Sequence, residues 1–314
     1  MEERDLDHML ASSPVLEKLV LVDTEDGPKH VRLRGRKLQC VILWLYMAVE
    51  LAATEAPRLE RLIMWGTRGR GSRARLKIAQ DAPALKVLGF LDAKVHELQI
   101  GDIVVKVDTN ASPIFTVREL LIGQIVTKIK TKVSPRSVVP SVKILAVKLN
   151  FGVFKEVQML VSFLRCFPNI ETLHVECVNT GEKPGKTSGK FFEKLHPIEC
   201  VQSNIKLVVL HVFHGDFSEL IFLDYLLQRA NALQKVIVVS SLPRDLLLTL
   251  GLGMIEDALK ARAVTPWANE ACMVLLMEPK DQRDLDFDQA FDLSVDDPFL
   301  QYGPEVFRLT KGGE

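Results

Sequence analysis

Cysteine and histidine side chains are the residues of this 314-residue chain that could most readily hold a metal. A structural zinc site usually draws on closely spaced ligand pairs such as Cys-x2-Cys. No tight pair occurs among the candidates in the middle of the chain, which are Cys166, His174, Cys177, His196 and Cys200. His211 and His214 are three residues apart on a predicted strand and its exit, so they do not share one strand face. We therefore predict no metal site and no cofactor.

The sequence also lacks the common catalytic motifs. The sequence contains no Gly-x-Ser-x-Gly elbow, no His-Glu-x-x-His helix and no phosphate-binding loop. The pattern Asp284-x-Asp286-x-Asp288 resembles part of a calcium loop, but the glycine and the closing glutamate of that loop are missing. We predict that the chain is not an enzyme and that residues 279–314 form a solvated acidic tail.

A basic segment at residues 67–75 offers an alternative function. It contains two glycines, a serine and four arginines, namely Arg68, Arg70, Arg73 and Arg75. Arginines in a flexible loop can bind the phosphates of RNA. No aromatic residues are interleaved for base stacking, however, so a solvated loop is the simpler interpretation. RNA binding through residues 68–75 stays the alternative function, with binding to nucleic acid not expected.

Composition narrows the class of protein. Lys plus Arg equals Asp plus Glu at 40 each, so the net charge indicates neither nucleic acid nor membrane as a partner. No apolar run reaches the roughly 20 residues of a membrane span, and the acidic N-terminal residues are unlike a secretory signal. Five scattered cysteines favour reduced thiols. These features predict a cytoplasmic or nuclear protein without a membrane partner.

A recurring unit must position any binding residues. Its best copy is a helical segment from Leu160, a turn at Pro168, and the strand pattern Ile170-x-x-Leu173-x-Val175. Stronger copies of this strand pattern begin at Leu16, Leu59, Leu85, Val142 and Leu233, and weaker ones at Leu38, Val95, Val117 and Leu207. The steps from Leu16 to Leu38 and on to Leu59 are 22 and 21 residues, within the leucine-rich-repeat period of roughly 20 to 29. Five copies share a turn proline two residues ahead of the pattern: Pro14, Pro57, Pro83, Pro140 and Pro168.

The predicted fold class is α/β, an irregular leucine-rich-repeat solenoid. Its sheet is curved and mostly parallel, with helices or loops on the convex side. Two departures make it irregular. Only Asn150 occupies the asparagine position that usually follows the strand, and the step from Leu85 to Val95 is ten residues, too short for a full unit.

Four segments follow from these patterns. The repeat region spans residues 1–178, and a linker rich in Gly, Lys and Thr begins at residue 179 and extends to 204. Residues 205–278 alternate strand and helix, with helices expected over 217–230 and 246–261, which favours parallel pairing through right-handed crossovers. The acidic tail, 279–314, follows.

A family resemblance rests on Phe163–Leu173, Pro197–Cys200 and Ile205–His211, and continues through Gly215 and Glu219. The chain resembles plant F-box proteins of the grass type, with leucine-rich repeats and a C-terminal FBD-like segment that would correspond to 205–278. The resemblance implies a non-enzymatic protein-binding module, similar to the substrate-recognition half of an F-box ubiquitin-ligase adaptor. We find no F-box segment in this chain, so binding to the cullin-ligase adaptor subunit is not expected.

The concave face of the solenoid is the predicted binding surface for an unidentified target protein. Tryptophan and arginine dominate the energetics of many interfaces, which singles out Trp65 and Arg61. The side chains expected on this face are Lys18, Arg61, Trp65, Lys148, Thr172, His174, Glu176 and Lys235.

The first repeat has no recognisable polar cap ahead of it. We therefore expect Leu6, Met9 and Leu10 to be exposed beside the edge strand Leu16–Leu21. An unpaired sheet edge next to apolar surface favours self-association.

Overall fold

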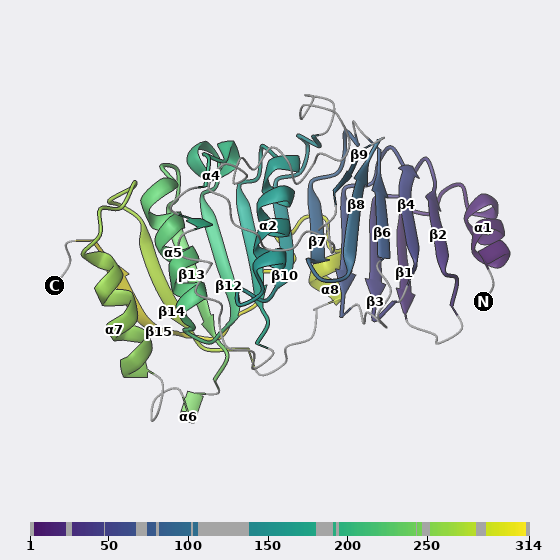
Figure 1. Ribbon diagram of the computed structural model, residues 1–314. Helices are drawn as coiled ribbons and strands as arrows, with labels where there is room; N and C mark the ends of the chain where they lie inside the picture. The colour runs from purple at the N-terminus through teal and green to yellow at the C-terminus, as the bar shows by residue number, and fades with distance from the viewer. Residues whose placement is uncertain are drawn as a thin grey trace. The chain divides into compact units, whose positions relative to one another are not determined.

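The computed structural model describes residues 3–22, 27–46, 48–66, 74–79, 82–101, 103–105, 138–179, 191–192, 195–242, 244–246, 252–280 and 287–311 (Figure 1). The chain forms two compact units. Unit 1 comprises residues 1–142 with 158–168, and unit 2 comprises residues 143–157 with 169–314. The weak repeat copy at Val117 and residues 180–190 and 193–194 of the predicted linker lie outside the described residues.

Unit 1 is built from two parallel sheets, between which the chain alternates. One sheet has the order β1 (Lys18–Val22), β3 (Cys40–Trp44), β5 (Arg61–Trp65) and β7 (Val87–Asp92). The other has the order β2 (His30–Arg34), β4 (Glu50–Glu55), β6 (Ala74–Ile78) and β8 (His96–Ile100), and β9 (Ile103–Val105) pairs antiparallel with β8. Each turn of the solenoid thus adds one strand to each sheet, and the repeat strands expected after Leu16, Leu38, Leu59 and Leu85 are confirmed.

The second sheet stands where the sequence predicted helices or loops on the convex side of the solenoid. Its strands largely alternate, most clearly in β2, where Val31 and Leu33 are buried between exposed polar neighbours. This period of two is the signature of a half-buried strand. The short step to Val95 also has its explanation here, because the apolar pattern that follows belongs to β8 of the second sheet and not to a new repeat.

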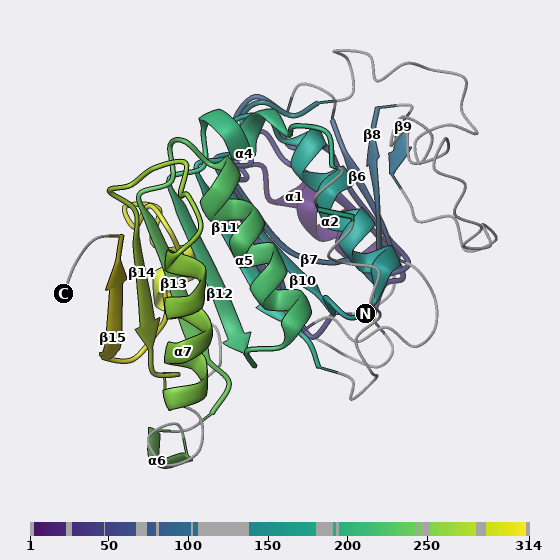
Figure 2. The ribbon, with the colours of Figure 1, turned by 60° about the vertical axis from the view of Figure 1, so that its left-hand side comes forward.

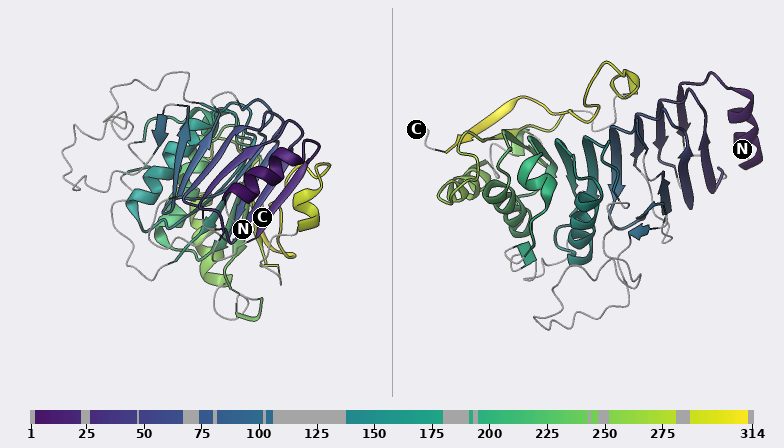
Figure 3. Two further views of the ribbon diagram at one scale, coloured as in Figure 1. Left: turned by 90° about the vertical axis from the view of Figure 1, so that its right-hand side faces the viewer. Right: turned by 90° about the horizontal axis from the view of Figure 1, so that it is seen from above.

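Helix α1 (Glu3–Ser12) corrects the expectation of a bare apolar end. It packs beside β2 at the end of unit 1, as Figure 3 shows. Leu6 and Leu10 are 1% and 4% exposed, because residues four apart share one helix face and this face meets the sheet. Met9, on another face, is 38% exposed.

Acid should destabilise unit 1 through His96 of β8. Its imidazole is 5% exposed, and its Nδ1 accepts a hydrogen bond from the Asp92 N–H at 2.8 Å. Burial lowers the pKa of His96 from its ordinary 6.5 to about 4. Because the unfolded chain takes up this proton at higher pH than the folded one, the stabilisation is complete above pH 6.5 and is lost as the pH falls toward 4.

We expect the free energy of unfolding to fall by about 2 kcal/mol between pH 7 and pH 5 from this group, at about 1.4 kcal/mol per pH unit below the unfolded pKa. Urea unfolding at both pH values measures it. His96→Gln should flatten the dependence, whereas His8→Gln, on an exposed side chain of α1, should not. Equal pH dependence in wild type and His96→Gln would contradict the prediction.

Unit 2 contains one sheet, and helices cover one of its faces (Figure 2). Its order is β10 (Ile144–Leu149), β11 (Thr172–Cys177), β12 (Leu207–Phe213), β13 (Lys235–Ser240) and β14 (Met273–Met277), all parallel, with β15 (Glu305–Thr310) antiparallel to β14. The helices that follow unit 1 along the chain are α2 (Phe154–Cys166), α4 (Glu199–Ser203), α5 (Phe217–Arg229), α6 (Arg244–Leu246), α7 (Leu252–Ala263) and α8 (Phe287–Phe291). The residues of α2 are divided between the two units: 154–157 belong to unit 2 and 158–166 to unit 1. Helices α5 and α7 lie over the same face of β12, β13 and β14 (Figure 2).

Helix α5 is fixed to unit 2 at both its first turn and its apolar face. Phe222 is fully buried, with its ring centroid 4.9 Å from that of Phe151 and 5.7 Å from that of Phe192. At the first turn, Glu219 is 3% exposed. Its Oε2 accepts hydrogen bonds from three successive N–H groups, those of His214 at 3.0 Å, Gly215 at 2.9 Å and Asp216 at 3.1 Å.

The described part of the acidic segment is folded, contrary to the expectation of a solvated tail. Residues 305–310 form β15, which pairs with the edge of β14, and Asp297 is only 8% exposed. The aspartates dominate the composition here, but Val306, Phe307 and Leu309 give the segment enough apolar character to form a strand. Asp284 and Asp286 lie outside the described residues.

Candidate protein-binding surfaces

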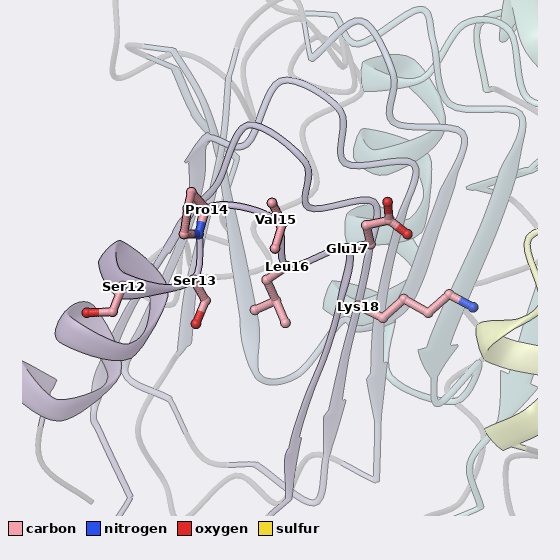
Figure 4. Close-up of a pocket in the computed structure, with 7 residues that line it drawn as sticks. All are labelled: Ser12, Ser13, Pro14, Val15, Leu16, Glu17 and Lys18. Atoms are coloured by element: carbon pink, nitrogen blue, oxygen red, sulfur yellow. The ribbon is translucent and has the colours of Figure 1, made fainter.

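A pocket lies where the chain enters β1 (Figure 4). Its volume is about 570 Å³, and a single continuous stretch, residues 12–18, lines it. Val15 at its rim is 75% exposed. Ligand sites of this size bring polar groups together from several elements, and this pocket draws on one. It therefore lacks the arrangement of a small-molecule site.

The residues predicted for unit 1 are Lys18, Arg61 and Trp65, and all three lie in the β1–β3–β5–β7 sheet. The register aligns Lys18, Cys40, Arg61 and Val87 in one row. Lys18 is exposed, whereas Arg61 is only 4% exposed and so does not present the accessible guanidinium that we predicted. Burial raises the pKa of Cys40 to about 11, although Arg61 and Lys18 act against the rise.

Aromatic side chains gather at the carboxyl ends of the same strands. Trp44 and Trp65 are paired in register, and their ring centroids are 6.4 Å apart in a stacked arrangement. Trp65 also meets the edge of Phe90 at 5.1 Å. Both tryptophans are partly exposed, so this aromatic row, defined by Trp44, Trp65 and Phe90, combines a rigid cluster with accessible surface. Trp65 is among the residues predicted from the sequence and Trp44 is not, although one repeat period separates the two.

Charged side chains in unit 2 pair across neighbouring strands. Lys148 and Glu176, both predicted binding residues, form an ion pair at 2.6 Å and stay partly exposed. Thr172 aligns with Leu207 and then with Lys235, and Thr172 and Lys235 are also partly exposed. These four predicted residues therefore remain accessible.

A second ion-pair cluster lies just ahead of β10, β11 and β12. Glu171 contacts Lys143 at 2.9 Å and Lys206 at 2.7 Å. Hydrogen bonds from these two lysines, Lys143 first, lower the pKa of Glu171. All three side chains are more than a third exposed, so salt screens the attraction and the cluster contributes little to stability.

His174 is the predicted residue that the structure places most differently. It is fully buried, with Nε2 at 2.9 Å from Asp297 Oδ2 and Nδ1 at 3.0 Å from His211 Nε2. The ring of Phe299 meets its imidazole at 5.4 Å. His174 is therefore covered by the chain's own residues and is not an exposed partner contact.

The partners of His174 use both of its ring nitrogens. Nε2 bonds the Asp297 carboxyl group, and Nδ1 faces His211. Burial, followed by the nearby His174, lowers the pKa of His211 to about 3. His211 is thus neutral at physiological pH, and its Nε2 lies 3.0 Å from Nδ1 of His174. The network anchors Asp297 to the sheet.

The next features concern metal ligands and membrane-spanning helices in the part of the chain that the structure describes. There, no three His, Cys, Asp or Glu side chains come together as metal ligands, and no helix is long and apolar enough to cross a bilayer. All five cysteines are buried, and burial raises the pKa of Cys166, for example, to about 12. A thiol with such a pKa is a poor nucleophile at neutral pH.

The basic segment is described only at its last two residues, Ala74 and Arg75. Arg75 lies in β6, 3.7 Å from the carboxylate of Glu97 in β8. Arg68, Arg70 and Arg73 lie outside the described residues. The one described arginine is therefore engaged with a cross-strand carboxylate.

Comparison with known families connects this architecture to one group. The family model described as "FBD-associated F-box protein At5g56370, LRR repeats" matches residues 1–122 and 114–175, and the FBD family model matches residues 193–238. Searches of curated proteins and of solved structures returned no match. The repeat matches span more than half of the chain, and the chain therefore belongs to the leucine-rich-repeat family of FBD-associated F-box proteins.

Proposed function

We propose that this protein is a non-enzymatic protein-binding module that acts as the substrate-recognition half of an F-box-type ubiquitin-ligase adaptor. Membership of the leucine-rich-repeat family supports a protein-interaction role, because repeat solenoids present extended binding surfaces. The FBD match over residues 193–238 links it to F-box proteins in particular. The target is a protein that offers an apolar side chain to the aromatic row.

The aromatic row carries the proposal. Partly exposed, mutually stacked tryptophans are the residue type on which interface hot spots concentrate, since they bury a large rigid surface with little loss of conformational entropy. The row lies at the ends of β3 and β5, and Lys18 of β1 provides an exposed charge on the same face. An apolar centre with a polar neighbour is the usual anatomy of a protein interface.

Replacing Trp65 with alanine should weaken target binding about 30-fold, the effect of losing about 2 kcal/mol at a hot spot. Quantitative mass spectrometry of proteins crosslinked to wild type and to Trp65→Ala identifies the target, and titration of the purified target gives the affinity ratio. Val15→Ala is the control, because Val15 is 75% exposed in unit 1 and lies outside the strands that carry the aromatic row. Identical affinities for wild type and Trp65→Ala would rule out this surface.

A further inference from the structure

The face of the unit 2 sheet opposite α5 and α7 carries an apolar area over β12, β13 and β14. Its central side chains form one buried cluster of Val209, Ile237, Val239, Leu275 and Met277. Leu300 and Tyr302 pack against this cluster from outside the sheet. They belong to residues 295–304, here called the strap, which leads into β15 on the side of the sheet away from α5 and α7 (Figure 3). Without the strap, the sheet would expose a contiguous apolar patch of the kind that marks interaction sites.

A polar anchor fixes the strap in one register. The Asp297 carboxylate bonds His174 through Oδ2 at 2.9 Å and accepts the Phe299 N–H through Oδ1 at 3.0 Å. The Phe299 side chain is 2% exposed. Because a buried carboxylate needs a matching donor, the sheet selects an acidic residue followed two positions later by an aromatic one.

Close backbone contact completes the fit at the other end of the strap. The Gly303 N–H donates to the Glu278 carbonyl at 2.8 Å, and the Glu278 N–H donates to the Pro304 carbonyl at 3.0 Å. A Cβ at position 303 would lie 3.1 Å from the carbonyl oxygens of both Glu278 and Pro279. The strap thus pairs with the end of β14 as an extended peptide, and a side chain at position 303 would push it away.

Other parts of the strap are held less firmly. Asp296 is exposed, and Leu300, Gln301 and Tyr302 are only partly buried. Segments with few fully buried contacts open at lower free energy than the core of a domain. The strap therefore combines a specific anchor with a limited contact area.

We propose that this face of unit 2 is a groove for an extended Asp-x-aromatic segment of a partner protein, and that the strap is its built-in competitor. The strap supplies the template for the partner: an aspartate to bond His174, an aromatic ring against its imidazole, and small or extended backbone beside Glu278. The inference extends the proposed protein-binding function but does not depend on the aromatic row of unit 1. The two surfaces can therefore be tested separately.

The test uses the full chain and a fluorescein-labelled peptide with the sequence of residues 293–304. In wild type the tethered strap acts at an effective concentration in the millimolar range, so the peptide should bind weakly. Phe299→Ala removes the strap's ring, and Gly303→Val displaces its backbone while it leaves the anchor residues intact. Fluorescence polarisation should show at least tenfold tighter peptide binding to both variants than to wild type.

Controls separate groove binding from general loosening. Asp296→Asn changes an exposed residue of the strap that takes no part in the anchor, and it should leave peptide affinity at the wild-type level. A peptide with Asn in place of Asp297 and Ala in place of Phe299 should not bind any of the chains, and this change leaves the protein untouched. Circular dichroism checks that each variant is folded.

Two results would overturn the proposal. One is equal peptide affinity in wild type, Phe299→Ala and Gly303→Val. The other is binding of the doubly substituted peptide as tight as that of the native sequence. Loss of target binding in Trp65→Ala, with tighter peptide binding in the two strap variants, would support both surfaces. Loss of target binding in Trp65→Ala together with either of the two overturning peptide results would reject the groove alone.

Discussion

Phe222→Ala is expected to lower the free energy of unfolding of unit 2 by about 3–5 kcal/mol, the usual cost of removing a buried phenylalanine ring. Phe222 is fully buried in α5 between the rings of Phe151 and Phe192. Alanine would leave a cavity that two aromatic neighbours can fill only in part, because their own positions are fixed by the sheet and by other rings. Urea unfolding followed by circular dichroism measures the change.

Phe217→Ala is the matched control, since it makes the same substitution five residues earlier in the same helix. Phe217 is 62% exposed, so its loss should change the stability by less than about 0.5 kcal/mol. Similar losses in the two variants would show that α5 does not pack on the face described above.

Glu219→Ala should destabilise unit 2 by about 3 kcal/mol. The carboxylate satisfies the N–H groups of His214, Gly215 and Asp216, which form a concave nest ahead of α5. Gly215 makes the nest possible because it adopts φ of +80°, a left-handed conformation that glycine tolerates best. Without Glu219, three donors at a buried helix start lose their acceptor, at roughly 1–3 kcal/mol for each donor that water does not reach.

Glu219→Gln should lose only about 1 kcal/mol, because the amide oxygen keeps an acceptor in place. The neutral side chain also avoids the cost of burying a charge, the effect that raises the pKa of Glu219. Glu256→Ala, which removes the partly exposed i,i+4 partner of Lys260 on α7, is the control and should cost less than about 0.5 kcal/mol. Thermal unfolding ranks the stabilities of the three variants. An equal loss of stability in Glu219→Ala and Glu256→Ala would contradict the role of Glu219 as the acceptor for these three N–H groups.

The repeat architecture was accessible from the sequence because its signals are local. The pattern that ends at Leu173 and Val175 places both side chains inward on β11, where both are fully buried. Alternation follows from the two-residue period of an extended backbone, so it needs no knowledge of distant residues. The turn proline and the repeat period then placed the other strands of the main sheet, and the helical spacing around Leu223 predicted α5.

The second sheet of unit 1 was missed for a different reason. Its strands have the same local alternation, as Val31 and Leu33 show, but the expectation of helices on the convex side outweighed it. Among binding residues, Trp65 could be named from its type and its place after a strand. Its partner Trp44 became significant only when the register paired the two rings.

The sequence by itself determined which side chains alternate inward along each repeat strand, because backbone geometry alone imposes that period. The tertiary structure alone decided that His174 is inaccessible. Its carboxylate partner, Asp297, lies 123 residues further along the chain, in a segment whose charge suggested a solvated tail. No local pattern encodes such a contact. It arises because the apolar outer face of unit 2 must be buried, and the strap that buries it carries the one carboxylate positioned to bond a histidine in the middle of the sheet.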